Sequence, residues 1–312
     1  MKKYFLIFLA LLFLLGAFTA YHYIKFSDGK LHVVFCDVGQ GDAIVIRTPK
    51  GKTILVDGGP DESVLGCLSG HMPFWQKTIE VTILTHPHAD HFMGFLPVIN
   101  RYKVNMFASE KLTNKTEGYR QLQELLQRRS PGRSPGDTYP HPNPLPKGEG
   151  ERVRGGKIRY LTAGDRFRSG DVKLTILGPA ASYLSSTSPG GLIGESEEFA
   201  SLVLQLAYGS FDMLLTGDSQ AEGLHSALDE ELGRKQVDVL QVPHHGSKTG
   251  LDIRILEELN PKLAVISVGK NKYGHPSRET LEFLSQFKLK VLRTDQKGDI
   301  EIVSDGKKWW VR

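Results

Sequence analysis

The stretch Thr85-His86-Pro87-His88-Ala89-Asp90-His91 holds four potential metal ligands within six residues, directly after the apolar and β-branched residues 81–84. Such a run predicts a strand, and the proline and alanine between the ligands favour a tight turn at its end. His86 and His88 lie two residues apart, so in an extended segment their imidazoles point the same way and can bind one ion. Asp90 and His91 follow one turn later and are directed toward a second point. The spacing therefore predicts two metal ions.

Two further groups of the same kind lie downstream. They are Thr216-Gly217-Asp218, after the predicted strand 211–216, and Pro243-His244-His245-Gly246-Ser247, after the predicted strand 237–242. A histidine-rich surface turn would explain the first cluster alone, but three such groups at strand ends indicate one site. Imidazoles and carboxylates without a thiolate suit zinc, manganese or iron. We expect two divalent ions, zinc or manganese, as cofactors.

The first cluster resembles the signature of the metallo-β-lactamase-fold hydrolases, His-x-His-x-Asp-His after a strand. Further strings resemble the ComEC-type branch of that superfamily: Phe35-Cys36-Asp37-Val38-Gly39-Gln40-Gly41-Asp42-Ala43, Val56-Asp57-Gly58-Gly59, Leu215-Thr216-Gly217-Asp218, Pro243-His244-His245-Gly246-Ser247 and Gly274-His275-Pro276-Ser277. The resemblance extends from residue 31 to the C-terminus apart from one insertion. In that branch the domain is either the soluble end of a large DNA-uptake membrane protein or a stand-alone hydrolase.

The order of elements and the resemblance agree on the fold. Strands dominate both halves of the chain and helices fall between them, which fits an α/β fold, a four-layered αββα sandwich with the ions at one edge between two sheets. Residues 180–196, rich in Ser, Gly and Pro, are predicted to form a loop. The pair Trp309-Trp310 is interpreted as packing and edge protection rather than a base-stacking platform.

The expected ligands divide between two ions. Asp218 is implied by the resemblance to bridge them, and the remaining ligands are His86 and His88 for one ion and Asp90, His91 and His244 for the other. His245 is the alternative to His244, because adjacent side chains on a turn diverge and the sequence does not decide between them.

Other residues are expected to act beside the ions. Asp57 is implied by the resemblance to hold the orientation of a ligand rather than to bind directly. The expected catalytic residues are Asp90, His275 and Lys248. His275 precedes a predicted helix, where a phosphate is favoured, and with His245 and Lys248 it is placed to hold a phosphate or protonate a leaving group.

The chain departs from its relatives at two points. Many dinuclear members carry a further histidine before the Thr-Gly-Asp aspartate, and the only candidate, His141, lies in the insertion and is not assigned. The Asn/Asp-rich turn of the ComEC-type branch is replaced by Glu197-Glu198-Phe199-Ala200. The occupancy of the metal position at His86 and His88 is therefore left open.

The N-terminus reads as a signal anchor or a signal peptide, residues 1–30. Lys2 and Lys3 precede an uncharged run that continues to Ile24. Residues 4–24 would span ~30 Å as a helix, which matches the hydrocarbon core. The cleavage site at Thr19 is poor, so we favour an uncleaved anchor in the cytoplasmic membrane. Lysines on the cytoplasmic side would leave the catalytic domain outside.

The chain of 312 residues has 40% hydrophobic content and a net charge of +4, which permits one large domain or two small ones. We expect one domain, residues 31–312. Residues 128–157, rich in Pro, Gly and Arg, are predicted to be a disordered insertion, with a basic flap over the substrate as the alternative. Cys36 lies in an apolar strand and is interpreted as a small hydrophobe. A bridge to Cys67 is the alternative if the domain is exported.

Three functions remain open at this stage. The first is a metal-dependent phosphodiesterase or nuclease acting on DNA in a competence-like role outside the cytoplasmic membrane. The second is a hydrolase of another ester or amide, including a β-lactam. The third is a non-catalytic DNA-binding module of an uptake machine, and a separately encoded membrane channel is a partner implied by the resemblance. The oligomeric state is not indicated by the sequence.

Overall fold

The computed structural model describes residues 2–128, 157–191, 200–229 and 236–312. Its first sheet has eight strands, in spatial order β17 (Trp309–Val311), β16 (Ile300–Ser304), β1 (Leu31–Phe35), β2 (Ile44–Arg47), β3 (Thr53–Val56), β5 (Val81–Leu84), β7 (Met106–Ser109) and β8 (Lys157–Tyr160). The strands from β17 to β3 are antiparallel neighbours, whereas β3, β5, β7 and β8 run parallel.

The second sheet has seven strands, in spatial order β15 (Lys290–Arg293), β14 (Leu263–Ile266), β13 (Val239–Gln241), β12 (Phe211–Leu215), β11 (Val203–Tyr208), β10 (Val172–Gly178) and β9 (Arg166–Ser169). Here β12 to β15 are parallel and β9 to β12 antiparallel. Each sheet thus has a parallel part, and the carboxyl ends of parallel strands present the loops that follow them at one edge. A short separate pair is formed by β4 (Thr78–Ile79) and β6 (Lys103–Val104).

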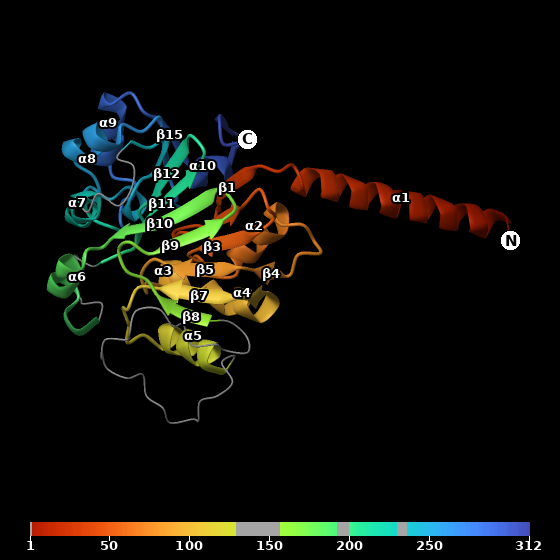
Figure 1. Ribbon diagram of the computed structural model, residues 1–312, viewed down its shortest axis with the longest axis horizontal. Helices are drawn as coiled ribbons and strands as arrows, with labels where there is room; N and C mark the ends of the chain where they lie inside the picture. The colour runs from red at the N-terminus through yellow and green to blue at the C-terminus, as the bar shows by residue number, and fades with distance from the viewer. Residues whose placement is uncertain (1, 129–156, 192–199, 230–235) are drawn as a thin grey trace.

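Helices cover the outer face of each sheet (Figure 1). The first sheet is covered by α2 (Ser63–His71), α3 (Ala89–Phe92), α4 (Phe95–Arg101) and α5 (Glu117–Arg128), and the second by α7 (Ala221–Asp229), α8 (Ile253–Leu259) and α9 (Arg278–Gln286). Short helices complete the chain: α6 (Ala181–Thr187), η1 (Pro189–Gly191), η2 (His244–Gly246) and α10 (Thr294–Lys297).

Three apolar cores hold these layers together. One lies between the sheets and draws on strands of both, another joins the first sheet to α2, α4 and α5, and the third joins the second sheet to α7, α8 and α9. Strands β1, β2 and β3 are buried along their whole length, because both faces are covered. The predicted αββα sandwich is therefore confirmed. Trp309 packs at the rim of the inner core, with its ring 6.1 Å from that of Phe211.

The interpretation of Cys36 as an unpaired hydrophobe is wrong. Cys36 and Cys67 form a disulfide with their Cα atoms 5.8 Å apart. Cys36 directly follows β1, and α2 packs over this end of the sheet, so that both cysteines lie in one core. By the chain-entropy account, closing a loop of this size stabilises the fold by about 3–4 kcal/mol.

The prediction of a loop at residues 180–196 is also wrong for the first half of this segment, because Ala181–Thr187 form helix α6. The hydroxyl groups of this segment do not compete with the helix. Ser185 donates to the carbonyl of Ala181 and Thr187 to that of Tyr183, both four residues back. The predicted insertion at residues 128–157, apart from its two end residues, lies outside the described residues, as do His141 and residues 197–199.

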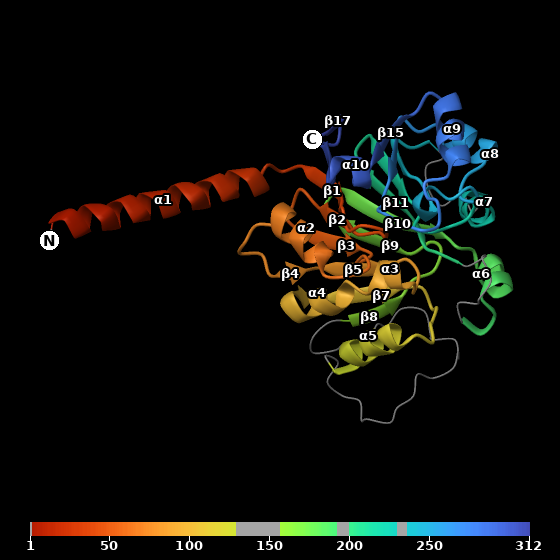
Figure 2. The same ribbon diagram turned by 180° about the vertical axis from the view of Figure 1, so that it is seen from behind.

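Helix α1 (Lys2–Phe26) leaves the rest of the molecule as a single long rod (Figures 1 and 2). Within the described ranges it is the one helix long and apolar enough to cross a membrane, by length and composition. Its side chains from Lys3 to Tyr21 are exposed.

Candidate metal centre

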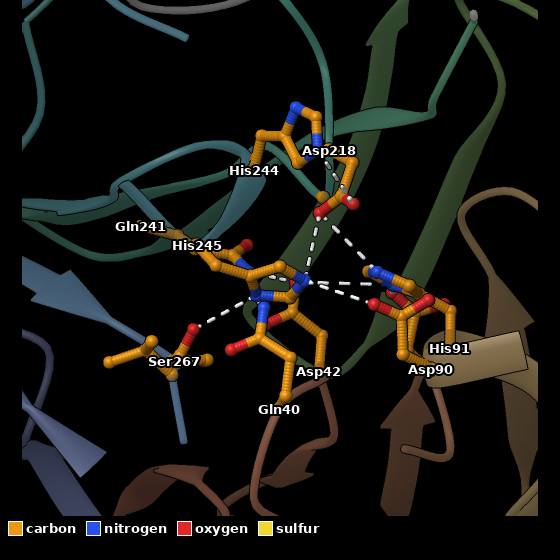
Figure 3. A network of polar contacts seen from close by, with 12 residues as sticks. Gln40, Asp42, Asp90, His91, Asp218, Gln241, His244, His245 and Ser267 are labelled. Carbon is orange, nitrogen blue, oxygen red and sulfur yellow. Dashed lines mark hydrogen bonds and ion pairs between the residues drawn. The ribbon is translucent and has the colours of Figure 1, made fainter. Parts of the chain in front are cut away.

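The metal centre is built where parallel strands of the two sheets end. His86 and His88 follow β5, Asp218 follows β12, and His244 and His245 follow β13. The turn after β12 is tight: Gly217 has φ +48, and a Cβ there would lie 2.5 Å from the Ser201 hydroxyl. A glycine is needed for Asp218 to reach the centre, where its carboxylate lies among imidazoles from both sheets (Figure 3).

One set of ligands is tightly gathered; we call Asp90, His91 and His245 the Asp90 group. Nε2 of His91 lies 3.3 Å and Nε2 of His245 3.5 Å from Oδ1 of Asp218. Nε2 of His245 also lies 3.4 Å from Oδ2 of Asp90. One ligand atom from each of these four residues falls within 4.8 Å of all the others, so they can share one ion.

A second set of imidazoles faces the other oxygen of Asp218; we call His86, His88 and His244 the His86 group. Nε2 of His86 and Nε2 of His244 each lie 3.8 Å from Oδ2 of Asp218. The rings of His86 and His88 are 4.6 Å apart between centroids. The two carboxylate oxygens of Asp218 are therefore directed at two different sets of histidines.

The two adjacent histidines after β13 separate between these groups. His245, not His244, lies with Asp90 and His91, which differs from the expected ligand set. Both residues have positive φ, 51° at His244 and 54° at His245, so the turn directs the neighbouring side chains to opposite sides of Asp218. The sequence contains only a weak signal for this conformation, because positive φ is uncommon in any residue other than glycine.

Asp57 fixes the orientation of histidines in both groups. Its Oδ2 accepts a hydrogen bond from Nδ1 of His91 at 2.9 Å and from the Thr85 hydroxyl at 2.7 Å, and its Oδ1 accepts from the Thr85 amide. The Thr85 hydroxyl lies 3.2 Å from Nδ1 of His86. Since that hydroxyl donates to Asp57, it accepts from His86. The proton on each Nδ1 leaves Nε2 free to bind an ion.

His245 is oriented in the same way by the backbone. Its Nδ1 donates to the carbonyl of Ser267 at 2.9 Å, and a carbonyl can only accept. Beneath it, Gln241 joins the two sheets: its Nε2 donates to Oδ2 of Asp42 at 2.7 Å, and its Oε1 accepts from the amide of Thr216. Gln241 and Ser267 were not predicted. The one available signal was a polar residue, Gln241, at the end of an apolar strand.

The pKa values of the ionisable groups in the centre are shifted because carboxylates and imidazoles are buried together there. Burial opposes the charge on His91, but Asp218, Asp57 and Asp90 outweigh it and raise the pKa of His91 well above its usual range. Burial likewise opposes the charge on Asp218, but His245 and His91 hold its pKa well below the usual range. Burial raises the pKa of Asp42 to about 6. In the absence of an ion, protons therefore balance the carboxylates.

The donor set fits divalent metal ions. Within the described part of the chain, Nε2 of His91, Nε2 of His245 and Oδ1 of Asp218 are buried and make no hydrogen bond. Buried polar atoms are rarely left in this state, and here they converge on one point. Imidazole nitrogens and carboxylate oxygens without sulfur suit zinc or manganese. A further arrangement of Cys67, His71 and Asp299 is no metal site, because the Cys67 sulfur is in the disulfide.

The remaining expected residues differ in their placement. The ring of His275 lies 5.3 Å from that of His244, on the side of the His86 group. It precedes the α9 cap, Ser277, whose hydroxyl accepts a hydrogen bond from the amide of Thr280. Lys248 is exposed and follows His245 by three residues.

Comparison with known proteins gives three matches of note. Residues 36–179 match the model of the metallo-beta-lactamase superfamily. ComE operon protein 3 of Bacillus subtilis (strain 168) is 28% identical over 280 residues, covering 88% of this chain and 33% of that protein. Competence protein ComA of Neisseria gonorrhoeae is 25% identical over 293 residues, covering 92% of this chain and 34% of that protein. The chain spans about a third of the length of these relatives.

Among solved structures, the metallo-beta-lactamase fold protein YhfI from Bacillus subtilis matches with a TM-score of 0.53 at 14% identity. The match covers 88% of this chain and 100% of that one. The fold is therefore shared over the whole of that protein and most of this chain, although most side chains differ. Residues 36–179 thus match the metallo-β-lactamase superfamily, and the similarity of most of the chain to ComE operon protein 3 and competence protein ComA supports a ComEC-type protein of the metallo-β-lactamase fold.

Proposed function

We propose that this chain is a metal-dependent phosphodiesterase that cleaves DNA outside the cytoplasmic membrane. The observation that supports metal-dependent hydrolysis most strongly is the position of Asp218. Its Oδ1 faces His91 and His245, and its Oδ2 faces His86 and His244. A carboxylate with one oxygen directed at each of two imidazole sets suits a bridge between two ions.

In this proposal each group binds one divalent ion, zinc or manganese, and Asp218 is common to both. A pair of such ions supplies the Lewis acidity that ionises water near neutral pH and offsets negative charge on the substrate. The chain supplies the rest. Asp57 and the Ser267 carbonyl hold protons on Nδ1 of His91 and His245, so Nε2 of each faces the centre. Asp90, at the edge of the centre, is only part-buried and can meet the substrate.

His275 and Lys248 are proposed to act on the substrate rather than on the ions. Burial and the neighbouring His244 and His245 lower the pKa of His275, so it is neutral at pH 7 and can donate a hydrogen bond to a phosphate or leaving-group oxygen. Lys248 is exposed and carries a charge that attracts a phosphodiester.

DNA is proposed as the substrate from the relatives. Two curated relatives carry names from competence, ComE operon protein 3 and competence protein ComA. This chain covers about a third of each of these relatives. A separate membrane channel protein is proposed as the partner for uptake on the resemblance to the ComEC-type branch alone. The mild net charge of +4 neither requires nor opposes a nucleic acid.

The location outside the cytoplasm is supported by two features. Helix α1 is long and apolar enough to anchor the chain, and Lys2 and Lys3 precede its apolar run, as on the cytoplasmic side of an anchor. The Cys36–Cys67 disulfide is the second feature, because such bonds persist mainly in oxidising compartments. Protease digestion of sphaeroplasts and of opened cells would test the topology.

Metal-dependent turnover of bis-p-nitrophenyl phosphate and of single-stranded DNA by the full chain in nanodiscs tests the proposal. We expect hydrolysis of both with manganese or zinc, none after chelation, and loss of both activities in Asp90→Ala and Asp218→Ala. Nitrocefin, a β-lactam, is the comparison substrate. Hydrolysis of nitrocefin alone would contradict the phosphodiesterase proposal. If the folded, metal-loaded chain binds DNA but does not hydrolyse it, the protein is a non-catalytic DNA-binding module instead.

A further inference from the structure

An exposed aromatic pair lies beside the end of α1. Phe74 and Trp75 follow α2 and remain 49% and 44% exposed. Their rings are 4.8 Å apart, and Phe74 lies 5.7 Å from Phe18 and 5.4 Å from His22 of α1. We call residues 73–76 the aromatic loop. Large apolar side chains rarely stay this exposed in adjacent positions without a partner.

Hydrogen bonds hold the backbone of the aromatic loop in place, and this conformation keeps the two aromatic rings exposed. The amide of Gln76 donates to the carbonyl of Pro73 and closes a turn. The side-chain amide of Gln76 donates to the Gly51 carbonyl at 3.2 Å, to the Thr53 hydroxyl at 3.0 Å and to the Thr78 carbonyl at 3.3 Å. These bonds tie the base of the loop to the start of β3, and the two rings project from it.

The loop lies at the height where α1 would leave a bilayer. A helix rises about 1.5 Å per residue, so ~30 Å of hydrocarbon takes up about 20 residues and extends from Tyr4 to about Tyr23. Tyr21 and Tyr23, each 63% exposed, fall at that boundary. Phe74 contacts α1 at Phe18 and His22, within the same stretch. Aromatic side chains concentrate at this depth in membrane proteins.

Charge around the aromatic loop also suits lipid headgroups. Lys25 at the end of α1 reaches the Gly70 carbonyl, and Lys77 is exposed directly after the loop. Residues 72–77 contain no acidic side chain. Positive charge beside exposed aromatic rings is the composition of a surface that contacts an anionic or zwitterionic membrane.

We propose that the aromatic loop is a second membrane contact, with Phe74 and Trp75 inserted in the headgroup region beside α1. Two contacts fix the orientation of the domain, which a single helix alone would not do. Figures 1 and 2 show α1 leaving on the side of α2 and β4, whereas α6 and α7 lie on the opposite side. Asp218 lies three residues before the start of α7, so in this proposal the metal centre lies on the side of the domain away from α1 (Figure 1).

Tryptophan fluorescence tests this in the full chain. The protein contains three tryptophans, so W309F/W310F leaves Trp75 alone and W75F/W309F leaves Trp310, which is 38% exposed, as the matched control. Both are reconstituted in nanodiscs of phosphatidylcholine and phosphatidylglycerol, with and without lipids brominated near the headgroup end of their chains. We expect loss of Trp75 fluorescence with brominated lipid and little loss for Trp310.

Trp75 emission that is unchanged by brominated lipid but quenched by acrylamide would overturn the proposal, as would equal lipid quenching of both tryptophans. If W309F/W310F fails to fold, W75F alone serves: it should remove the lipid-quenched fraction of the wild-type emission, and an unchanged fraction would count against the proposal. The readout does not involve turnover, so its failure and that of the phosphodiesterase proposal are distinguishable.

Discussion

The two halves of the metal centre are supported to different degrees. In the Asp90 group, both histidines donate from Nδ1 to strong acceptors at 2.9 Å, the Asp57 carboxylate and the Ser267 carbonyl. In the His86 group, Nδ1 of His86 reaches the Thr85 hydroxyl at 3.2 Å, a longer bond to a neutral acceptor. A ligand that is already oriented loses less freedom on binding. We therefore expect the Asp90 group to bind its ion more tightly than the His86 group.

Asp218→Asn should have the largest effect, because it removes the one carboxylate that serves both groups. The amide keeps the size of the side chain and loses its charge. We expect turnover to fall by about 100-fold or more and both ions to be lost, measured with bis-p-nitrophenyl phosphate and by elemental analysis after dialysis. Asp171→Asn, an exposed turn position, is the control. An Asp218→Asn protein that retains both ions would contradict a shared ligand.

Alanine at each of the two adjacent histidines separates the groups directly. His245→Ala should remove the tighter ion and His244→Ala the weaker one, because the turn directs the two side chains to opposite sides of Asp218. Titration of each apo variant with zinc should leave one weak site in His245→Ala and one tight site in His244→Ala. Equal loss in both variants would show that the two halves do not differ.

Asp57→Asn should have a smaller effect on metal affinity, about 10- to 100-fold, since Asp57 orients ligands without binding an ion. Asparagine tolerates the positive φ of 56° at this position, so the backbone is preserved. An amide in place of Oδ2 would donate to Nδ1 of His91 and move the ring proton to Nε2, where it blocks the ion. Zinc titration of the variant measures the loss, and an affinity equal to wild type would mean that Asp57 only packs.

Much of this arrangement could be predicted from local pattern. The buried strands β1, β2, β3 and β5 are continuous apolar runs, and the ligands follow strands directly, so the layers and the cluster at their edge are encoded in short stretches of sequence.

What could not be predicted depends on backbone conformation and on packing between distant segments. The division of His244 and His245 rests on two residues with positive φ. The Cys36–Cys67 bond rests on how α2 lies across the end of β1, and the two cysteines are 31 positions apart in the sequence. Strand β9 has a weak sequence signal, because Arg166–Ser169 contains two arginines and lies at the edge of its sheet, where its residues are exposed or half-buried.

The smallest expected effect concerns Glu110, a buried carboxyl outside the metal centre. Comparison with Asp218 shows what the surrounding imidazoles do, because Glu110 lacks them. It follows β7, is buried, and within the described residues its Oε2 makes no hydrogen bond. Burial raises its pKa to about 8. In the unfolded chain a glutamate ionises near pH ~4.3, whereas in the folded protein Glu110 keeps its proton up to about pH 8. Stability should therefore fall as pH rises through this window.

Glu110→Gln keeps the neutral form at every pH and should remove this loss. We expect its Tm to exceed that of wild type at pH 8 and to match it near pH ~4.5, with about 2–4 °C for each kcal/mol regained. Calorimetry at both pH values measures the difference, with Glu279→Gln in the exposed first turn of α9 as the control. Metal binding should be unchanged. If wild type and Glu110→Gln lose stability in parallel between these pH values, Glu110 is ionised in the folded chain, and an unseen cation must balance it as the histidines balance Asp218.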